Sequence, residues 1–282
     1  MKRLTITLVA AAAAVHAFAQ EAMFPTPDAK TLGMGGVAMT TLSGSHALYG
    51  NSATAAFSLM PSQISSSYYG QDESDYYAVS GYWRFDTFNL AQIGWRQCLR
   101  ERGNNDMAVD LGYSRRIDDR WAVGVVARYM HLKRPGDVTA DALAADLNAA
   151  WMAPVEIGSF STNLGGWFGG GDRSLPMSFT AGAALDTFLT DAHEITVGAD
   201  LGYRFSPGAM RGFMLSAGAE YNLMQLVQLR AGYHYGELRG DDPSYASVGA
   251  GFRFLHLRLD FAYLFTAKHT PDIYSISFGF DF

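Results

Sequence analysis

The sequence predicts an all-β fold, a transmembrane antiparallel β-barrel of about fourteen strands with an N-terminal segment in its lumen. Apolar and small polar residues alternate along many segments of about ten residues, the length that a tilted strand needs to cross a bilayer. Charged residues make up 17% of the chain, below the usual level of about a quarter, while aromatic residues reach 13%. Beyond the first residues no apolar run is long enough for a membrane-spanning helix, which excludes a helical membrane protein.

Residues 1–19 are typical of a secretory signal peptide. Lys2 and Arg3 precede an apolar run, and Ala17 and Ala19 are the small residues that a cleavage site needs. An N-terminal membrane anchor is the alternative, but the run is short for a span. We therefore expect export to the outer membrane of a Gram-negative bacterium, with outer-membrane lipid around the barrel.

The first eight strands are expected in the region between the N-terminal segment and residue 189. The segment 120–130 has Trp121 and Tyr129 at its ends and aliphatic residues between them, as expected for aromatic belts at the two membrane interfaces. The segment 142–152 is interpreted as a strand, although its alanines would also suit a helix. The glycine-rich stretch 165–174 is interpreted as a mobile loop. The eight candidate segments are 62–70, 75–85, 87–97, 107–117, 120–130, 142–152, 155–167 and 178–189.

Six further segments alternate more regularly. In the last one, every second residue from Tyr274 to Phe282 is apolar, and the residues between are Ser, Gly and Asp. The apolar face suits lipid, and the small polar face suits a hydrated lumen. The total is fourteen strands, with twelve as the alternative because single-chain barrels have even numbers. The six segments are 193–205, 212–222, 227–236, 245–254, 255–265 and 274–282.

Residues 20–60 lack this alternation and are rich in Gly, Ala, Ser and Thr. A barrel of about fourteen strands is wider than one whose own side chains can fill its interior. We therefore expect residues 20–60 to form a hatch in the lumen and residues 61–282 to form the barrel. Gly33, Gly35 and Gly36 would permit tight turns against the wall.

Two motifs in this segment resemble the N-terminal hatch of FadL-like (fatty-acid-transporter-like) outer-membrane barrels. LGMGGVAM, from Leu32, and ALYGNSATAAF, from Ala47, look most similar to the PorV/PorQ branch. AADLNAAW, from Ala144, and LRAGYHYG, from Leu229, are also similar to that branch. Ser52 stands where the branch has proline after the asparagine, so the turn lacks a fixed φ.

The resemblance implies a fourteen-stranded barrel with a hatch, and two functions follow as candidates. The preferred one is a non-catalytic component of type IX-like secretion, with secretion-system proteins or exported cargo as partners. The alternative is a FadL-like channel that admits a hydrophobic small molecule past the hatch. The candidate hatch and pocket residues are Gly33, Met34, Gly35, Gly36, Met39, Leu42, Leu48, Tyr49, Asn51 and Phe57.

Several charged residues fall on the inward face of their strands. They would either pair with neighbouring strands and the hatch or line a polar conduit and set its selectivity. These residues are Asp110, Arg128, Asp200, Arg204, Glu220, Arg230, Arg253, Arg258, Asp260 and Asp281.

The final strand resembles the signal that the barrel-assembly machinery reads in outer-membrane barrels. Its aromatic residues would otherwise only face lipid, and the two roles are compatible. The candidate signal residues are Tyr274, Phe278, Phe280 and Phe282.

No motif for catalysis stands out. The chain has no G-x-S-x-G or H-E-x-x-H motif, and its single cysteine, Cys98, can form neither an internal disulfide nor a cysteine-pair zinc site. The net charge is −6 and no basic block occurs. We expect no enzyme activity, no cofactor or metal, and no nucleic-acid partner.

Overall fold

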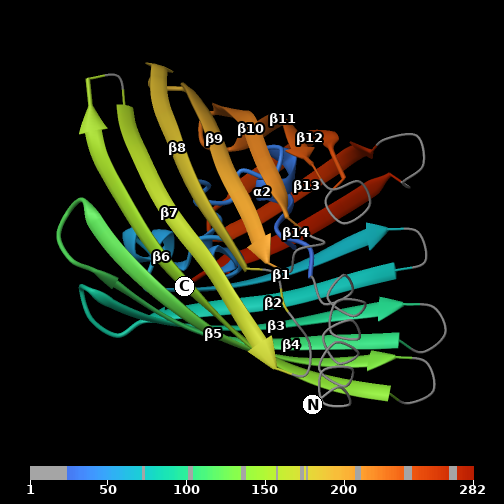
Figure 1. Cartoon of the computed structure of the whole chain (residues 1–282). Helices are drawn as coiled ribbons and strands as arrows, with labels where there is room; N and C mark the ends of the chain where they lie inside the picture. The colour runs from blue at the N-terminus through green and yellow to red at the C-terminus, as the bar shows by residue number, and fades with distance from the viewer. Residues whose placement is uncertain are drawn as a thin grey trace.

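The computed structural model describes residues 24–71, 74–100, 104–134, 138–156, 158–171, 175, 177–206, 211–237, 243–266 and 272–282. In this part of the chain, fourteen antiparallel strands close into one barrel (Figure 1). They are β1 (Ser62–Gln71), β2 (Ser74–Arg84), β3 (Asn89–Arg100), β4 (Asn104–Arg116), β5 (Trp121–Arg134), β6 (Val138–Val155), β7 (Gly158–Gly171), β8 (Met177–Thr190), β9 (His193–Ser206), β10 (Gly212–Leu223), β11 (Val227–Gly236), β12 (Tyr245–Phe254), β13 (Leu257–Thr266) and β14 (Ile273–Asp281).

The barrel is closed by the pairing of its first and last strands. β1 pairs with β14 from Gln63 opposite Asp281 to Gly70 opposite Tyr274. Closure leaves no strand edge without backbone partners, which a sheet in lipid requires. The predicted barrel is confirmed with fourteen strands, and the alternative of twelve is wrong. The predicted signal peptide, residues 1–19, lies outside the described residues.

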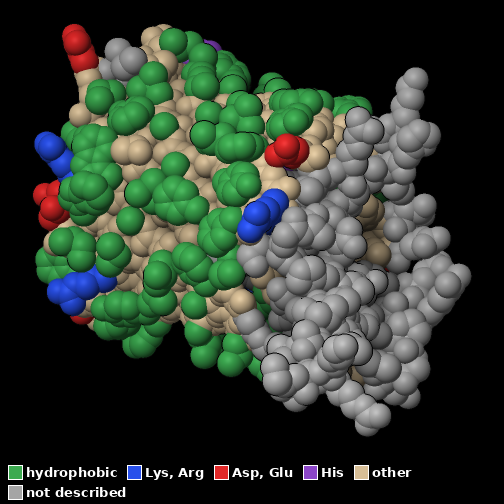
Figure 2. All heavy atoms as spheres, viewed as in Figure 1, with side chains coloured by type: hydrophobic (Ala, Val, Ile, Leu, Met, Phe, Trp, Pro, Cys, Tyr) green, Lys and Arg blue, Asp and Glu red, His purple; other side chains and the backbone are tan. Residues whose placement is uncertain are grey.

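The two faces of the wall divide as the alternation predicts. In β5, Trp121, Val125 and Tyr129 are 41% to 49% exposed on the outer surface, while Val126 and Met130 are buried on the lumen side. Hydrophobic side chains cover most of the visible outer surface (Figure 2). No helix in the described residues is long and apolar enough to cross a membrane.

The alanine-rich and glycine-rich segments both form strands. The prediction of a strand at 142–152 is confirmed by β6, but the prediction of a loop at 165–174 is wrong as far as Gly171, because β7 pairs with β6 through that residue. Residues 172–174 lie outside the described residues. The glycines make room for packing. A Cβ on Gly165 would lie 2.8 Å from the sulfur of Met39, and one on Gly169 would lie 2.6 Å from Leu175.

The junctions between consecutive strands lie alternately at the two ends of the barrel. The turns at one end include residues 224–226 between β10 and β11 and residues 255–256 between β12 and β13. We call this the turn end. The last residues of β9 and β11 and the first residues of β10 and β12 lie at the other end, which we call the loop end.

Residues 24–61, which we call the plug segment, lie inside the barrel (Figure 1). They contain the helix α2 (Ala29–Gly33) and the 3-10 helices η2 (Gly44–Tyr49) and η3 (Ser52–Phe57). α2 packs mainly against β12 and β13, η2 against β1 and β2, and η3 against β4 and β5. The core of the molecule therefore lies between the plug segment and the lumen face of the wall. Residues 20–23 of the predicted hatch lie outside the described residues.

Candidate functional site

The glycine motif of the plug segment packs backbone to backbone against the wall. Gly35 and Gly36 have φ of 69° and 79°, where residues with a side chain are strained. A Cβ on Gly35 would lie 2.4 Å from the backbone nitrogen of Tyr233. The wall contributes its own glycines here, since a Cβ on Gly218 would lie 2.2 Å from the carbonyl oxygen of Met34. Gly33 follows the same pattern, because a Cβ there would lie 3.2 Å from Gly249.

Asn51 and Ser52 fasten the second motif. The Asn51 side chain accepts a hydrogen bond from the Ala53 nitrogen at 3.1 Å and donates one to the Met39 carbonyl at 3.1 Å. The Ser52 carbonyl accepts hydrogen bonds from Gln92 at 3.2 Å and from Ser114 at 2.8 Å. Hydrogen bonds from the wall therefore hold this turn in place. In the branch that the motif resembles, a proline restrains the same turn.

Other predicted plug residues serve packing. Leu48 is fully buried and occupies the space in which a Cβ on Gly94 or Gly112 would lie. Phe57 packs against a cluster of small residues that includes Ala122. Leu42, in contrast, is 44% exposed.

A line of buried ion pairs crosses four neighbouring strands. Arg96 on β3 contacts Asp110 on β4 with its Nη2 at 3.0 Å and its Nε at 3.2 Å. Arg128 on β5 bonds to Asp110 through its Nε and to Asp146 on β6 through its Nη2 at 2.9 Å. Asp110 and Arg128 were predicted to face the lumen in this way. Arg96 was not singled out, although it shares the inward face of β3 with Gln92.

A second set of ion pairs joins the plug segment to β10, β11 and β13. Lys30 lies 3.5 Å from Glu220, and Arg230 contacts the same carboxylate at 2.5 Å. Arg230 also contacts Asp260 at 2.7 Å, and Arg258 contacts Asp260 at 3.2 Å. Burial lowers the pKa of the Lys30 ammonium, and the charge of Glu220 opposes that change. In the structure these charges pair across strands and with the plug segment, and their role in selectivity stays a prediction.

Four of the predicted charges are not members of these two sets of ion pairs. The Asp200 carboxylate accepts hydrogen bonds from the backbone nitrogens of Ala38 at 2.6 Å and Met39 at 2.8 Å. Arg204 lies on the same face of β9 and donates to the sulfur of Met214 at 3.3 Å. Asp281 accepts a hydrogen bond from Gln63, and Arg253 lies opposite Arg258 in the register of β12 and β13.

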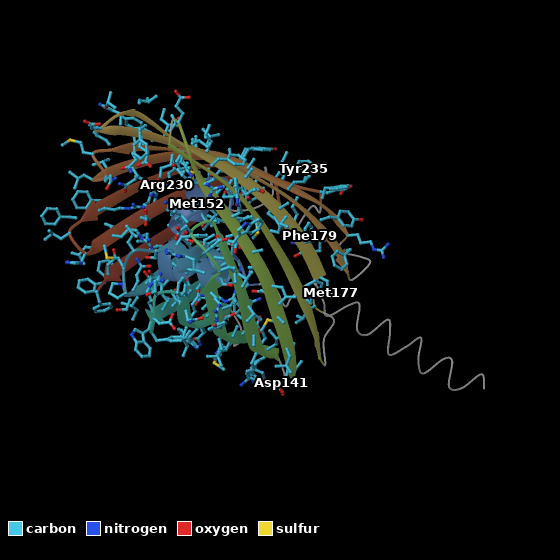
Figure 3. All side chains as sticks on the ribbon, turned by 90° about the vertical axis from the view of Figure 1, so that its left-hand side faces the viewer. Asp141, Met152, Met177, Phe179, Arg230 and Tyr235 are labelled. Carbon is cyan, nitrogen blue, oxygen red and sulfur yellow. The ribbon has the colours of Figure 1, made fainter. Side chains whose placement is uncertain are left out.

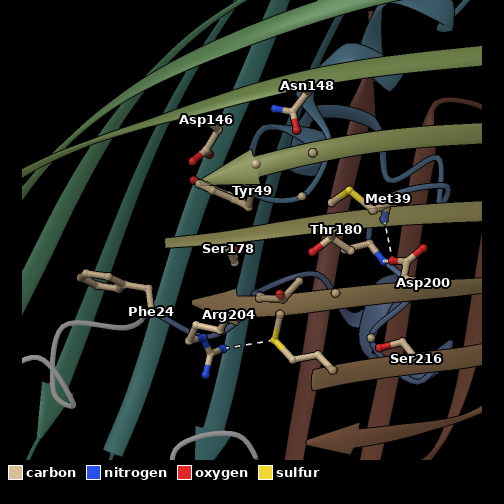
Figure 4. Close-up of a pocket in the computed structure, with 18 of the residues that line it drawn as sticks. Phe24, Met39, Tyr49, Asp146, Asn148, Ser178, Thr180, Asp200, Arg204 and Ser216 are labelled. Carbon is tan, nitrogen blue, oxygen red and sulfur yellow. Dashed lines mark hydrogen bonds between the residues drawn. The ribbon is translucent and has the colours of Figure 1, made fainter. Parts of the chain in front are cut away.

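A cavity of about 260 Å³ lies between the plug segment and the wall (Figure 4). Its larger apolar lining residues are Phe24, Met39, Tyr49, Met130 and Met214. Its charged lining consists of Arg96, Arg128, Asp146, Asp200 and Arg204. Because Met130 and Arg204 lie near the loop ends of β5 and β9, the cavity lies on the loop side of the plug segment. None of the second set of ion pairs lines it.

Two aromatic rings flank one of the cavity's arginines. The Arg96 guanidinium lies 5.1 Å from the centre of the Phe24 ring and 4.7 Å from that of Tyr49. Such contacts hold a cation on the face of a ring. The Tyr49 hydroxyl donates to the Val79 carbonyl at 2.7 Å, and burial raises its pKa. The rings of Phe24 and Tyr49 therefore form an aromatic side of the cavity. They lie against Arg96, whose charge is paired with Asp110.

Only part of this lining was predicted. Gly36, Met39 and Tyr49 border the cavity, whereas Met34 and Leu48 do not. Phe24, Met130 and Met214 were missed. The alternation of β5 places Met130 on the lumen face and could have identified it, but no pattern in the sequence marks Phe24.

The predicted assembly residues lie on the outer face, along β14 and directly after its last residue. Tyr274, Phe278 and Phe282 are exposed, and the Phe282 ring lies 4.8 Å, centre to centre, from that of Phe280. Their role as an assembly signal stays a prediction. Among the described residues no cluster of His, Cys, Asp and Glu could hold a metal ion, and Cys98 is buried.

Sequence comparisons give no match, and structural comparisons give many. No protein-family model matches the chain, and no curated protein sequence matches it. The CymD monoaromatic hydrocarbon channel matches with a TM-score of 0.66 and 13% identity, over 91% of this chain and 97% of that chain. The Ralstonia pickettii toluene transporter TbuX matches with 0.62 and 12%, over 94% and 100%. A Pseudomonas aeruginosa FadL homologue matches with 0.61 and 12%, over 92% and 99%. The fold is thus similar to FadL-type outer-membrane barrels.

Proposed function

We propose that this chain is a channel in the outer membrane of a Gram-negative bacterium and that it admits hydrophobic small molecules. The observation that carries the proposal is the cavity on the loop side of the plug segment, with its aromatic and thioether lining. Aromatic rings and the polarisable sulfurs of methionine suit a small apolar solute. Two of the structures that the fold resembles are described as a hydrocarbon channel and a toluene transporter, which supports this function over a role in secretion.

The geometry implies an order of events. A solute from the loop end would pass Phe24 and reach Met39 and Tyr49, where the plug segment blocks the way. Asp200 holds the backbone of Ala38 and Met39 by two hydrogen bonds. On this route the plug segment, which packs against the lumen face of the wall, would have to release these bonds before the solute could pass. The buried ion pair between Lys30 and Glu220 would keep α2 in place during this step.

Two tryptophan substitutions on neighbouring residues of β8 test the proposal. Ser178 lines the cavity, and Phe179 lies on the outer face with 49% exposure (Figure 3). Cells that carry the parent barrel in their outer membrane should take up labelled toluene faster than cells without it. Ser178→Trp should reduce this uptake to the level without the barrel, whereas Phe179→Trp should leave it unchanged. Equal uptake with and without the parent barrel would contradict the proposal.

A role in secretion remains the second candidate because the LGMGG motif at Leu32 resembles the PorV/PorQ branch. The measurement that separates the two is a pull-down of the barrel from its native outer membrane in mild detergent, followed by mass spectrometry. Reproducible recovery of secretion proteins or surface cargo would support the secretion role. Recovery of the barrel alone with an apolar molecule would support the channel.

A further inference from the structure

Two arginines face each other at the turn end of the lumen. Arg253 on β12 lies directly opposite Arg258 on β13 in the register of the two strands. Both are on the lumen side, since the neighbouring Phe252, Phe254 and Leu257 are exposed on the outer face. Like charges that lie directly opposite each other destabilise a pair of strands. This arrangement therefore needs a compensating charge.

The carboxylates nearby are already shared by other cations. Glu220 is shared by Lys30 and Arg230, and Asp260 is shared by Arg230 and Arg258. Arg253 adds a fourth positive charge to these two carboxylates. In the part of the chain that the structure describes, the Arg253 guanidinium has no hydrogen bond and no ion pair.

The surroundings of Arg253 also limit how well water can solvate its charge. Its Nε is buried, and the side chain is only partly exposed. Arg258 is buried beside it and donates to the Ser43 carbonyl of the plug segment at 2.9 Å. Lys30, Arg230, Arg253 and Arg258 thus share the two carboxylates of Glu220 and Asp260, and Arg253 is the one of the four with no ion pair to either. A buried or partly buried charge is normally paired.

We propose that Arg253 and Arg258 bind a small oxyanion, a carboxylate or a phosphate group, at the turn end of the lumen. The planar fork of a guanidinium matches the paired oxygens of such groups better than it matches a spherical halide. The site lies on the opposite side of the plug segment from the cavity and goes beyond the proposed channel function. A free anion can reach it from the turn end, whereas a lipid head group in the surrounding bilayer cannot, because both arginines point into the lumen.

The test measures anion binding to the full chain, purified in mild detergent, by calorimetry at constant ionic strength. Sodium phosphate and sodium benzoate are titrated separately, which distinguishes an inorganic anion from an organic carboxylate. At least one of them should bind the parent, and Arg253→Gln should weaken that binding at least about tenfold, the effect of losing one charge-assisted contact. Arg120→Gln, which removes an exposed arginine at a turn of the same barrel end, should bind as the parent does.

Stability supplies a second readout that a purely structural arginine would not give. Without an oxyanion, Arg253→Gln should resist urea as well as the parent or better, because the substitution removes a repulsion. Phosphate or benzoate should raise the stability of the parent and not that of the variant. The proposal is overturned if neither anion binds the parent, if Arg253→Gln binds as tightly as the parent, or if the variant unfolds more easily without any anion.

Discussion

The buried carboxylate of Asp110 shows how much depends on single residues inside this lumen. It is fully buried and contacts two arginines, Arg96 and Arg128, from the neighbouring strands. Removing one member of a buried ion pair leaves an uncompensated charge, which costs about 3–5 kcal/mol. An exposed pair contributes about 0–1 kcal/mol, because water and salt screen it.

The chain offers a matched pair of aspartates for measuring this difference. Asp119 lies in a turn, almost fully exposed, and contacts Arg116 at 3.3 Å. Asp110→Asn should lower the free energy of unfolding by about 3 kcal/mol or more, and Asp119→Asn should lower it by less than about 1 kcal/mol. Urea unfolding of both variants in the same detergent measures the two changes. Equal losses would show that the Asp110 ion pairs do not contribute as buried pairs.

Parity predicted which charges face the lumen, but it could not predict their partners. Asp110 and Arg128 were assigned inward from alternation alone, because side chains alternate along a strand. Their contact depends on the register between β4 and β5, in which they lie directly opposite. Register comes from the turns and the facing side chains together. For the same reason the position of Arg253 directly opposite Arg258 was not foreseen.

At the scale of elements, η2 contains a buried histidine, from which we predict that the docking of the plug segment depends on pH. His46 is buried, and its Nδ1 lies 2.7 Å from the hydroxyl of Ser80 on β2. Burial lowers its pKa from 6.5 to about 4, while Asp28 raises it and Arg258 lowers it further. Between pH 6.5 and about 4, His46 is therefore neutral in the docked plug segment, whereas it binds a proton in an undocked one.

The sign of the effect follows from that difference. The contribution of neutral His46 to docking is fully present above pH 6.5 and is lost as the pH falls from 6.5 through 4. Proteolysis of the plug segment in the intact barrel should accelerate over this range. In His46→Gln, which cannot titrate, the rate should change less over the same range. Identical pH profiles for parent and variant would exclude His46 as the cause.

The plug segment also shows which elements the sequence left undetermined. Its position in the lumen was expected from barrel width and from the lack of alternation in residues 20–60. The glycine-rich end of β7 was misassigned, because glycine usually marks loops. Here Gly165 and Gly169 leave room for Met39 and Leu175, a reason that depends on residues outside β7. The cavity could not be predicted, because it is the space that plug segment and wall leave between them.

At the scale of the whole molecule, the strand count followed from periodicity because every span repeats the same pattern of apolar and small polar residues. Periodicity does not predict how the barrel closes, because closure requires the first and last strands to meet in a defined register. The seam between β1 and β14 places Ser66 opposite Phe278, and Phe282 donates its backbone N–H to the Ser62 carbonyl at 3.0 Å. The aromatic end of the chain is therefore part of the closing ladder.

A disulfide across the seam tests both closure and register. Ser66 and Phe278 lie on the outer face, directly opposite each other, at a separation that suits a disulfide. Ser66→Cys with Phe278→Cys should form a bond on mild oxidation, which a shift in gel mobility reports. Ser66→Cys with Tyr274→Cys should not, because Tyr274 lies four residues further along β14, about 13 Å away. Cys98 is buried and adds no competing thiol. A bond in the second pair and none in the first would mean that β1 and β14 meet in another register.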